Sequence, residues 1–304
     1  MAFTAKDVAE LREKTGCGMM DCKKALTASD GDFDKAIDFL RERGLAAATK
    51  KAGRIAAEGI AYATVNDDST VGVDIEVNAE TDFVAKNAEF QNFVHTCAQT
   101  VMEQNPVDVN ALLQCTASGS DKTVDALLKE KILVIGENIK IRRFKRLEGV
   151  VSAYIHAEGK IGVLVKFETS PEVAAKEGFK EYAKNIAMQI AAISPQYLNR
   201  DAVPADVVEH EKSILKEQIV NDGKPAAIAE KIVAGRLGKF FKDVCLVDQA
   251  YIKDGNISVQ QYTDATAKEL GGSIKIAEYV RFEKGEGLEK REDNFADEVA
   301  GMIK

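Results

Sequence analysis

The chain has 304 residues, of which 45% are hydrophobic and 30% are charged, with 41 basic against 49 acidic residues and a net charge of −8. This length accommodates two or three domains with a sizeable core. The acidic balance disfavours a nucleic acid or an anionic membrane as the main partner, and no apolar run is long enough to span a membrane.

The cysteines and the N-terminus indicate a reducing compartment. Cysteine occurs without framework spacing, at Cys17, Cys22, Cys97, Cys115 and Cys245. Cys17 and Cys22 have no neighbouring histidine, so we expect reduced thiols and no metal site. The N-terminus lacks the apolar stretch of a signal peptide, and its acidic character is unlike that of an organelle transit peptide. We therefore expect a cytoplasmic protein.

Residues 4–44 have the pattern of three short helices. The first begins near Thr4 and stops at Gly16, and the second covers about residues 20–28. The third ends at Gly44, which is typical of a left-handed helix cap. A compact three-helix bundle of this kind is typical of modules that dock on other proteins.

Two adjacent methionines, Met19 and Met20, stand at the start of the second of these helices. Adjacent residues cannot both face one small core, so we expect one of them to be exposed, and methionine suits an adaptable contact surface. From the pattern alone, Lys23 is interpreted as part of a solvated face. Residues 46–57 are interpreted as a charged helical tether.

The segment 81–87 joins a strand of alternating valine and isoleucine to a helix that carries Phe90. Thr81 or Asp82 can cap that helix, because an oxygen on a short side chain accepts a backbone N–H of the first turn. Phe83, beside this acid, has two interpretations. It is either an anchor for a partner protein or the start of the buried stripe that Phe90 continues. Spacing alone favours the buried stripe.

The centre of the chain is duplicated. Residues 59–72 recur as residues 149–162, with the glycines at both ends of the segment retained. A later strand, residues 139–148, recurs as residues 274–283. Each copy therefore predicts a hairpin, a helix and a third strand that returns to the hairpin. We expect two α+β subdomains, each a three-stranded antiparallel sheet with helices over one face.

The two copies give different residues at the segment of interest. In this alignment Phe83 pairs with Val173, and a one-residue shift further on pairs Phe90 with Phe179. An acid precedes the apolar residue in both copies, so a capping acid requires no function. The buried-stripe interpretation leaves the replacement of valine by a larger ring unexplained.

A helical hairpin is predicted within the second copy. Residues 205–220 carry apolar side chains at coiled-coil-like spacing, residues 221–225 turn the chain, and an apolar return helix follows. Such an arm leaves apolar surface uncovered, which favours a homodimer or a contact with a partner. A last short helix, residues 294–303, is too short to be stable alone, so we expect it to dock.

Catalytic chemistry is not visible in the sequence. No phosphate-binding glycine loop follows a strand, and no nucleophile–base pair or metal-ligand set has usable spacing. His95 and His210 are interpreted as structural or solvated. For His156, at a strand end, a polar contact with a partner and no role at all are equally good interpretations. We expect no cofactor, no metal and no enzymatic activity; the enzyme alternative uses His156 with a cysteine.

A second alternative is an RNA- or ribosome-binding protein. It would use Lys50, Lys51 and Arg54 of the tether and the basic run at residues 142–146, where Phe144 could stack on a base. Alternation along a strand splits those charges between two faces, so a solvated strand is the preferred interpretation.

Two long motifs carry a resemblance to a known family. Residues 11–26 (LREKTGCGMMDCKKAL) and residues 81–87 (TDFVAKN) closely resemble elongation factor Ts, and residues 135–139 (IGENI), residues 223–225 (GKP) and residues 281–287 (RFEKGEG) also match. The resemblance covers essentially the whole chain in order. Cys17 stands where alanine is common and Ala79 where cysteine is common.

The resemblance implies an exchange factor for the translational GTPase elongation factor Tu, acting on its GDP-bound and nucleotide-free forms. It implies that a ubiquitin-associated-like N-terminal module grips the GTPase domain, that Asp82 and Phe83 wedge among its helices and disturb its Mg²⁺ site, and that the arm dimerises, giving a homodimer or a 2:2 assembly. The terminal helix would belong to a module that also contacts the partner. The residues carried over are Leu11, Met19, Met20, Lys23, Thr81, Asp82, Phe83, Val84 and His156.

The expected organisation is α+β with five regions. They are the N-terminal module and linker (1–56), core subdomain N (57–148), core subdomain C (149–198 and 242–286), the helical hairpin (199–241) and a C-terminal helical module (287–304).

Overall fold

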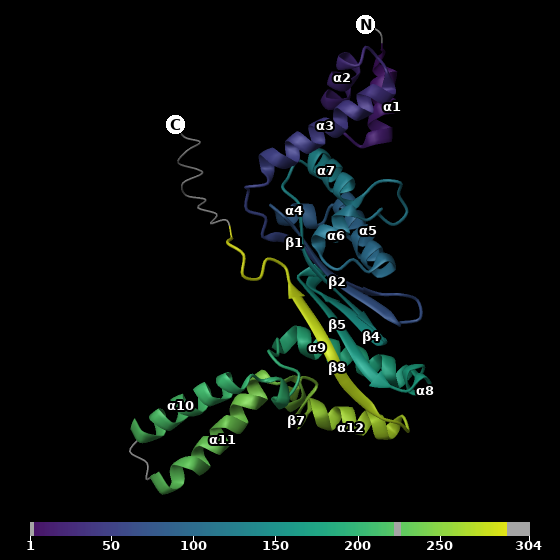
Figure 1. Ribbon diagram of the computed structural model, residues 1–304. Helices are drawn as coiled ribbons and strands as arrows, with labels where there is room; N and C mark the ends of the chain where they lie inside the picture. The colour runs from purple at the N-terminus through teal and green to yellow at the C-terminus, as the bar shows by residue number, and fades with distance from the viewer. Residues whose placement is uncertain (1–2, 222–225, 291–304) are drawn as a thin grey trace.

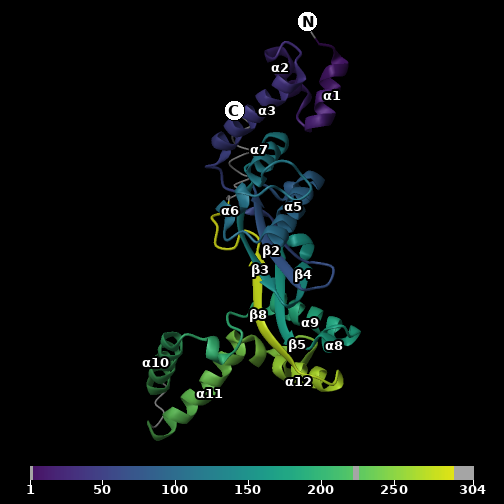
Figure 2. The ribbon, with the colours of Figure 1, turned by 45° about the vertical axis from the view of Figure 1, so that its right-hand side comes forward.

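A computed structural model describes residues 3–221 and 226–290. The molecule is elongated, with a helical bundle at the N-terminal end, two sheets in the centre and a helical hairpin that projects from the opposite end (Figures 1 and 2). The fold is α+β, as the sequence predicts. The predicted helix at residues 294–303 lies outside the described residues, as does most of the predicted turn at 221–225.

The N-terminal bundle consists of α1 (Ala5–Thr15), α2 (Met19–Ala28) and α3 (Phe33–Lys51). Thr4 and Asp7 form a capping box at the start of α1, and Gly16, with φ 68°, ends it as predicted. The bundle encloses a small core of its own, formed by Val8, Leu11, Cys17, Cys22, Ala25, Leu26, Ala36 and Leu40.

The prediction that the third helix ends at Gly44 is wrong, because α3 continues to Lys51. Gly44 is buried where α3 crosses α7 (Val124–Ile135), and a Cβ atom there would lie 3.2 Å from the carbonyl oxygen of Lys129. Glycine thus permits close helix packing at this point. The Lys51 ammonium adds a hydrogen bond of 3.3 Å to the carbonyl of Ile132. The expected tether is therefore helical only in its first part, and that part is fixed to the core.

The first sheet has the order β1-β2-β3, all antiparallel, formed by β1 (Glu58–Val65), β2 (Val71–Ala79) and β3 (Lys140–Glu148). Its core side is covered by α5 (Ala88–Gln104), with α6 (Val109–Gln114) and α7 nearby. Valine and isoleucine alternate along β2, and Val73, Ile75 and Val77 are fully buried against this layer.

The second sheet repeats the first, as the duplication predicts. Its order is β4-β5-β8, with β4 (Val150–His156), β5 (Ile161–Thr169) and β8 (Ile274–Glu283). The helices α8 (Pro171–Ala174), α9 (Glu177–Ile193) and α12 (Val259–Glu269) pack on it, beside a small hairpin of β6 (Ala250–Tyr251) and β7 (Asp254–Ser258). Each sheet also has a register shift at the same place, after Glu76 in β2 and after Lys166 in β5.

The two sheets pack against each other through a pair of equivalent glycines. A Cβ atom on Gly72 would lie 2.4 Å from Cδ1 of Leu164, and one on Gly162 would lie 2.3 Å from Oδ1 of Asp74. Each glycine therefore leaves the space that a side chain of the other sheet fills. Asp74 is completely buried there, and neither of its oxygens has a hydrogen-bond partner among the described residues.

The predicted arm is present as α10 (Ala205–Asn221) and α11 (Ala226–Val244), which run side by side away from the second sheet (Figure 1). Leu215, Ile219 and Val233 are buried between the two helices, and Cys245 is buried at the base of the arm. Ile214 of α10 remains 37% exposed.

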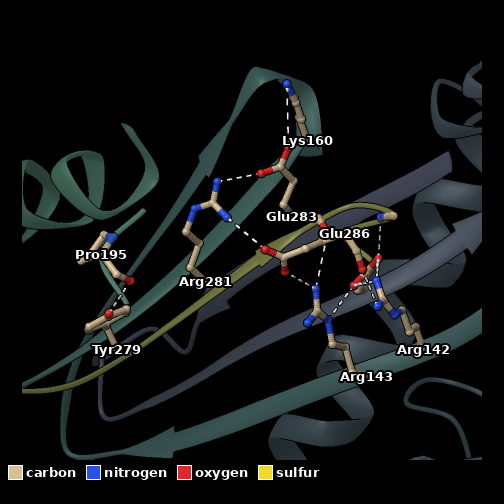
Figure 3. Close-up of polar contacts among 10 residues, drawn as sticks. Arg142, Arg143, Lys160, Pro195, Tyr279, Arg281, Glu283 and Glu286 are labelled. Carbon is tan, nitrogen blue, oxygen red and sulfur yellow. Dashed lines mark hydrogen bonds and ion pairs between the residues drawn. The ribbon is translucent and has the colours of Figure 1, made fainter. Parts of the chain in front are cut away.

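After β8 the chain returns to the first sheet, where its arginines hold it. Gly285 donates its backbone N–H to Glu76 at 2.8 Å, and Arg143 bonds both Glu76 (2.7 Å) and Glu286 (3.1 Å). Arg142 also bonds Glu76 and reaches the carbonyl of Glu286, and Arg281 lies between the carboxylates of Glu283 and Glu286 (Figure 3). The solvated-strand interpretation is therefore wrong for Arg142 and Arg143, because buried Glu76 requires paired cations, whereas Lys145 is exposed as that interpretation predicts.

Replacing Gly44 by valine is expected to lower the free energy of unfolding by about 1–3 kcal/mol, because the added atoms overpack the contact between α3 and α7. The measurement is chemical denaturation. Gly235→Val, in α11, is the matched control, since no atom lies within 4 Å of a Cβ at that glycine. An equal change in the free energy of unfolding of both variants would contradict the prediction, because it would mean that the substitution acts only through helix propensity.

Candidate functional site

The most exposed large aromatic side chain of the described residues lies shortly after β2, the second strand of the first sheet. Phe83 belongs to the short helix α4 (Asp82–Ala85) and is 80% exposed, beside exposed Asp82. Phe90 is fully buried, and Val84 is nearly so. The buried-stripe interpretation of Phe83 is therefore wrong. The interpretation fails because the helix is broken: α4 ends at Ala85 and α5 begins at Ala88, so Phe83 and Phe90 do not belong to one helix and helical periodicity does not relate them.

The capping prediction is also wrong. Asn87, and neither Thr81 nor Asp82, caps the long helix α5, with its Oδ1 accepting the N–H of Glu89 at 2.8 Å. Thr81 precedes α4 but makes no side-chain capping bond to it. Its hydroxyl instead donates to Glu137 at 2.7 Å. The first turn of α4 is thus left without the usual side-chain cap.

The structure changes the alignment between the two copies. Two residues, Glu80 and Thr81, separate β2 from α4, whereas Ser170 alone separates β5 from α8. Val84 and Val173 are consequently equivalent, and both are buried. The pairing of Phe83 with Val173 is wrong by one residue, because the shift occurs before the helix and not after it.

With the corrected alignment, Phe83 is equivalent to Glu172. Both residues hold the second position of a short helix, and both are exposed. The first copy therefore carries a large aromatic ring at a position where the second copy carries a charged surface residue. This ring has no role in the protein's own core.

A groove of about 480 Å³ lies beside α4 and is lined by both copies. Asp82 and Lys86 line one part, and the turn at residues 157–160, which follows β4, lines another. Ala157 and Glu158 in that turn have φ of 47° and 55°, a left-handed conformation that is costly for residues other than glycine. Gly159 presses on β1, since a Cβ there would lie 2.6 Å from Ile60. The turn is thus packed closely against β1 where it lines the groove.

His156 is exposed at the end of β4, immediately before this turn, as the sequence predicts for a strand end. Its Nδ1 lies 3.2 Å from the hydroxyl of Tyr154. The structure therefore places the α4 segment and the surroundings of His156 around one groove, although they come from different copies.

The remaining site residues lie on the N-terminal bundle, at the end of the molecule away from the helical arm (Figure 2). Met19 and Met20 are 46% and 61% exposed, so the expectation of at least one exposed methionine is confirmed, and Lys23 is exposed beside them. The expectation that Leu11 contacts a partner has to be corrected, because Leu11 is completely buried in the bundle core and offers no surface to a partner. Its place on the inner face of α1 is the reason.

Several residues of the two alternative interpretations have structural partners. Among the cations proposed for RNA, Lys51 bonds Ile132, Arg54 pairs with Glu80 at 3.4 Å, and Arg146 bonds the carbonyl of Met102. Four cysteines are buried, which raises the pKa of the thiol in each; that of Cys245 rises to about 11. They are poor candidates for an enzyme nucleophile.

Two further features concern only the part of the chain that the structure describes. Within residues 3–221 and 226–290, no group of three or more histidine, cysteine or carboxylate side chains is placed to hold a metal ion. In the same part of the chain, none of the helices has the length and apolar character needed to cross a membrane.

Comparison with known proteins defines the class of the protein. The family model described as Elongation factor TS matches residues 80–286, so the chain is a translation elongation factor by family. It is 50% identical to elongation factor Ts of Trichlorobacter lovleyi over 99% of this chain and 98% of that protein. Elongation factor Ts of Syntrophotalea carbinolica is 50% identical over the full length of both chains. The chain belongs to the elongation factor Ts family.

Proposed function

We propose that the protein binds elongation factor Tu in its GDP-bound form and promotes the release of GDP, so that GTP can enter. The observation that supports this most is Phe83, whose ring is 80% exposed beside an acid on the short helix α4 and takes no part in the protein's own core. Aromatic anchors supply much of the energy of protein interfaces. The insertion of Asp82 and Phe83 near the Mg²⁺ site of the GTPase is part of this proposal.

The mechanism requires no reactive group on this chain. Mg²⁺ bridges phosphate oxygens of the bound nucleotide, so a partner that displaces its ligands weakens nucleotide binding. By reciprocity, the nucleotide weakens the grip of the factor to the same extent. A coupling of about 1–3 kcal/mol corresponds to roughly 5–150-fold in affinity. The factor therefore acts by binding the nucleotide-free GTPase more tightly than the nucleotide-bound one.

The test is the rate at which a fluorescent GDP analogue leaves elongation factor Tu, followed by stopped flow with excess unlabelled GDP. The proposal predicts an acceleration that saturates with the concentration of this protein. A rate unchanged at any concentration would exclude the proposed function.

The N-terminal bundle is proposed as a second contact, through Met19, Met20 and Lys23. Replacing both methionines by alanine is expected to weaken binding to the GTPase by about tenfold or more, because two flexible apolar side chains are removed from the interface. Both side chains are about half exposed, so the stability of the bundle should change little. Calorimetry measures the affinity; an unaltered value would remove the bundle from the interface.

The arm is proposed as a dimer contact. Exposed Ile214 and the partly buried Val207 and Val208 provide apolar surface on α10. Light scattering across a concentration series gives the molar mass. A monomer at every concentration, alone and in complex with the GTPase, would contradict this part of the proposal.

A further inference from the structure

Glu137 holds the residues that precede Phe83. It follows Gly136, the left-handed cap of α7, and its carboxylate points back to the end of β2. One oxygen accepts the backbone N–H groups of Glu80 and Thr81, each at 3.0 Å, and the other accepts the Thr81 hydroxyl at 2.7 Å. A carboxylate that accepts three hydrogen bonds from adjacent residues fixes their backbone strongly.

The same junction is fixed from the other direction. The Glu80 carboxylate accepts the backbone N–H of Asn138 at 2.6 Å and pairs with Arg54 at 3.4 Å. The Asn138 amide in turn donates to the backbone carbonyl of Arg54 at 2.8 Å. The Glu137 carboxylate thus binds backbone N–H groups at the end of β2, and the Glu80 carboxylate binds the backbone next to Glu137. Arg54, in the segment that follows the N-terminal bundle, bonds to both sides of this arrangement.

The second copy lacks this arrangement. Because the third strands align Ile139 with Ile274, the counterpart of Glu137 is Gly272. A Cβ there would lie 2.5 Å from Val173, so that space is occupied by the core of the second copy. Ser170 accepts the N–H of Val173 and caps the short helix in the usual way.

The first copy therefore has both an extra residue between β2 and α4 and the Glu137 carboxylate, and the second copy has neither. The added residue at the end of β2 displaces the start of α4, and Thr81, at the cap position, turns its hydroxyl to Glu137. The direction in which α4 carries Phe83 then depends on a side chain that lies 56 residues after Thr81 in the sequence.

We propose that Glu137 is a positioning residue for nucleotide exchange, which holds α4 so that Phe83 points into the partner. This inference rests on the proposed function and assigns a role to a residue that does not itself touch the GTPase. Misplacement of a contact group by about 1 Å can cost up to a hundredfold in rate, so a loss of this fixation should appear in the exchange rate.

Glu137→Ala is expected to lower the saturating rate of GDP release by about tenfold, while the concentration for half-saturation changes less than about threefold. Glu137→Gln should retain most of the rate, because its amide can accept the two N–H groups and donate to the Thr81 hydroxyl. Glu168→Ala, which breaks an exposed ion pair with Lys275 in the second copy, is the matched control and should behave as the unsubstituted protein.

A double-substitution cycle separates positioning from general stability. In a Phe83→Ala background, Glu137→Ala should cause no further loss of rate, because the ring that it positions is absent. The same tenfold loss in both backgrounds, or no loss in either, would overturn the inference.

Hydrogen exchange of the free protein tests the inference without the GTPase. The amides of Glu80 and Thr81 should exchange at least tenfold faster in Glu137→Ala, with the protection of β2 unchanged. Unchanged exchange at these amides would overturn the positioning role. A failure of the unsubstituted protein to accelerate GDP release would instead overturn the proposed function, and the two failures are distinguishable.

Discussion

Replacement of Phe83 by alanine is expected to slow GDP release at saturating factor by roughly 30-fold, the equivalent of about 2 kcal/mol. The ring is 80% exposed in the free protein, so it contributes little to the protein's own core. Its removal should leave the free energy of unfolding within about 0.5 kcal/mol of the original. The measurement is the release of a fluorescent GDP analogue, together with a denaturation curve for each variant.

The duplication supplies the control for this experiment. Glu172 holds the equivalent surface position in the second copy, so Glu172→Ala removes an exposed side chain from the same local structure. It should leave GDP release unchanged. The wedge assignment is wrong if Phe83→Ala releases GDP at the original saturating rate, or if the two variants lose rate equally.

A second large effect is expected in the dependence of stability on pH. Asp74 is fully buried between the sheets, and burial raises its pKa from 3.8 to about 8, with the charge of Arg143 opposing the change and the charge of Glu76 reinforcing it. Below about pH 4 the group is neutral in both the folded and the unfolded chain. As pH rises toward 8, only the unfolded chain loses the proton, so the folded state becomes progressively less stable. The full difference is on the order of 5 kcal/mol.

Asp74→Asn keeps the volume of the side chain and cannot ionise. Its free energy of unfolding, measured in urea, should therefore depend less on pH between 5 and 8 than that of the unsubstituted protein, by as much as about 1.4 kcal/mol per pH unit. Parallel pH profiles for the two proteins would show that Asp74 is not neutral in the folded state at pH 5–8.

The sequence predicted the architecture well because the architecture depends on repeated local patterns. The alternation along β2 and β5 and the matching third strands are visible in the sequence, and they are sufficient to predict two equivalent sheets. The apolar spacing of the arm was informative for the same reason. Gly16 was recognisable as the end of the first helix because the helical pattern stops there.

The errors have a common cause, which is that contacts between distant segments override local preference. Gly44 has the local character of a helix end, but α7 makes its lack of a side chain useful inside α3. The exposure of Phe83 depends on a helix break at residues 86–87 and on one extra residue before α4, neither of which periodicity reveals. Glu137 lies 56 residues from Thr81, so no local pattern connects them.

The candidate site was accessible from the sequence mainly through resemblance to the elongation factor Ts family. The resemblance directed attention to Phe83, whereas spacing favoured a core residue. Resemblance also carried over Leu11, which is buried. A motif marks a segment but does not distinguish the residues that support it from those on its surface.

The most direct measurement is a crystal structure of this protein in complex with nucleotide-free elongation factor Tu. Phe83 should be enclosed by side chains of the GTPase, with Asp82 beside the residues that hold Mg²⁺ in the nucleotide-bound form. A complex in which Phe83 remains open to solvent, or packs only against its own subdomain, would contradict the proposed mechanism.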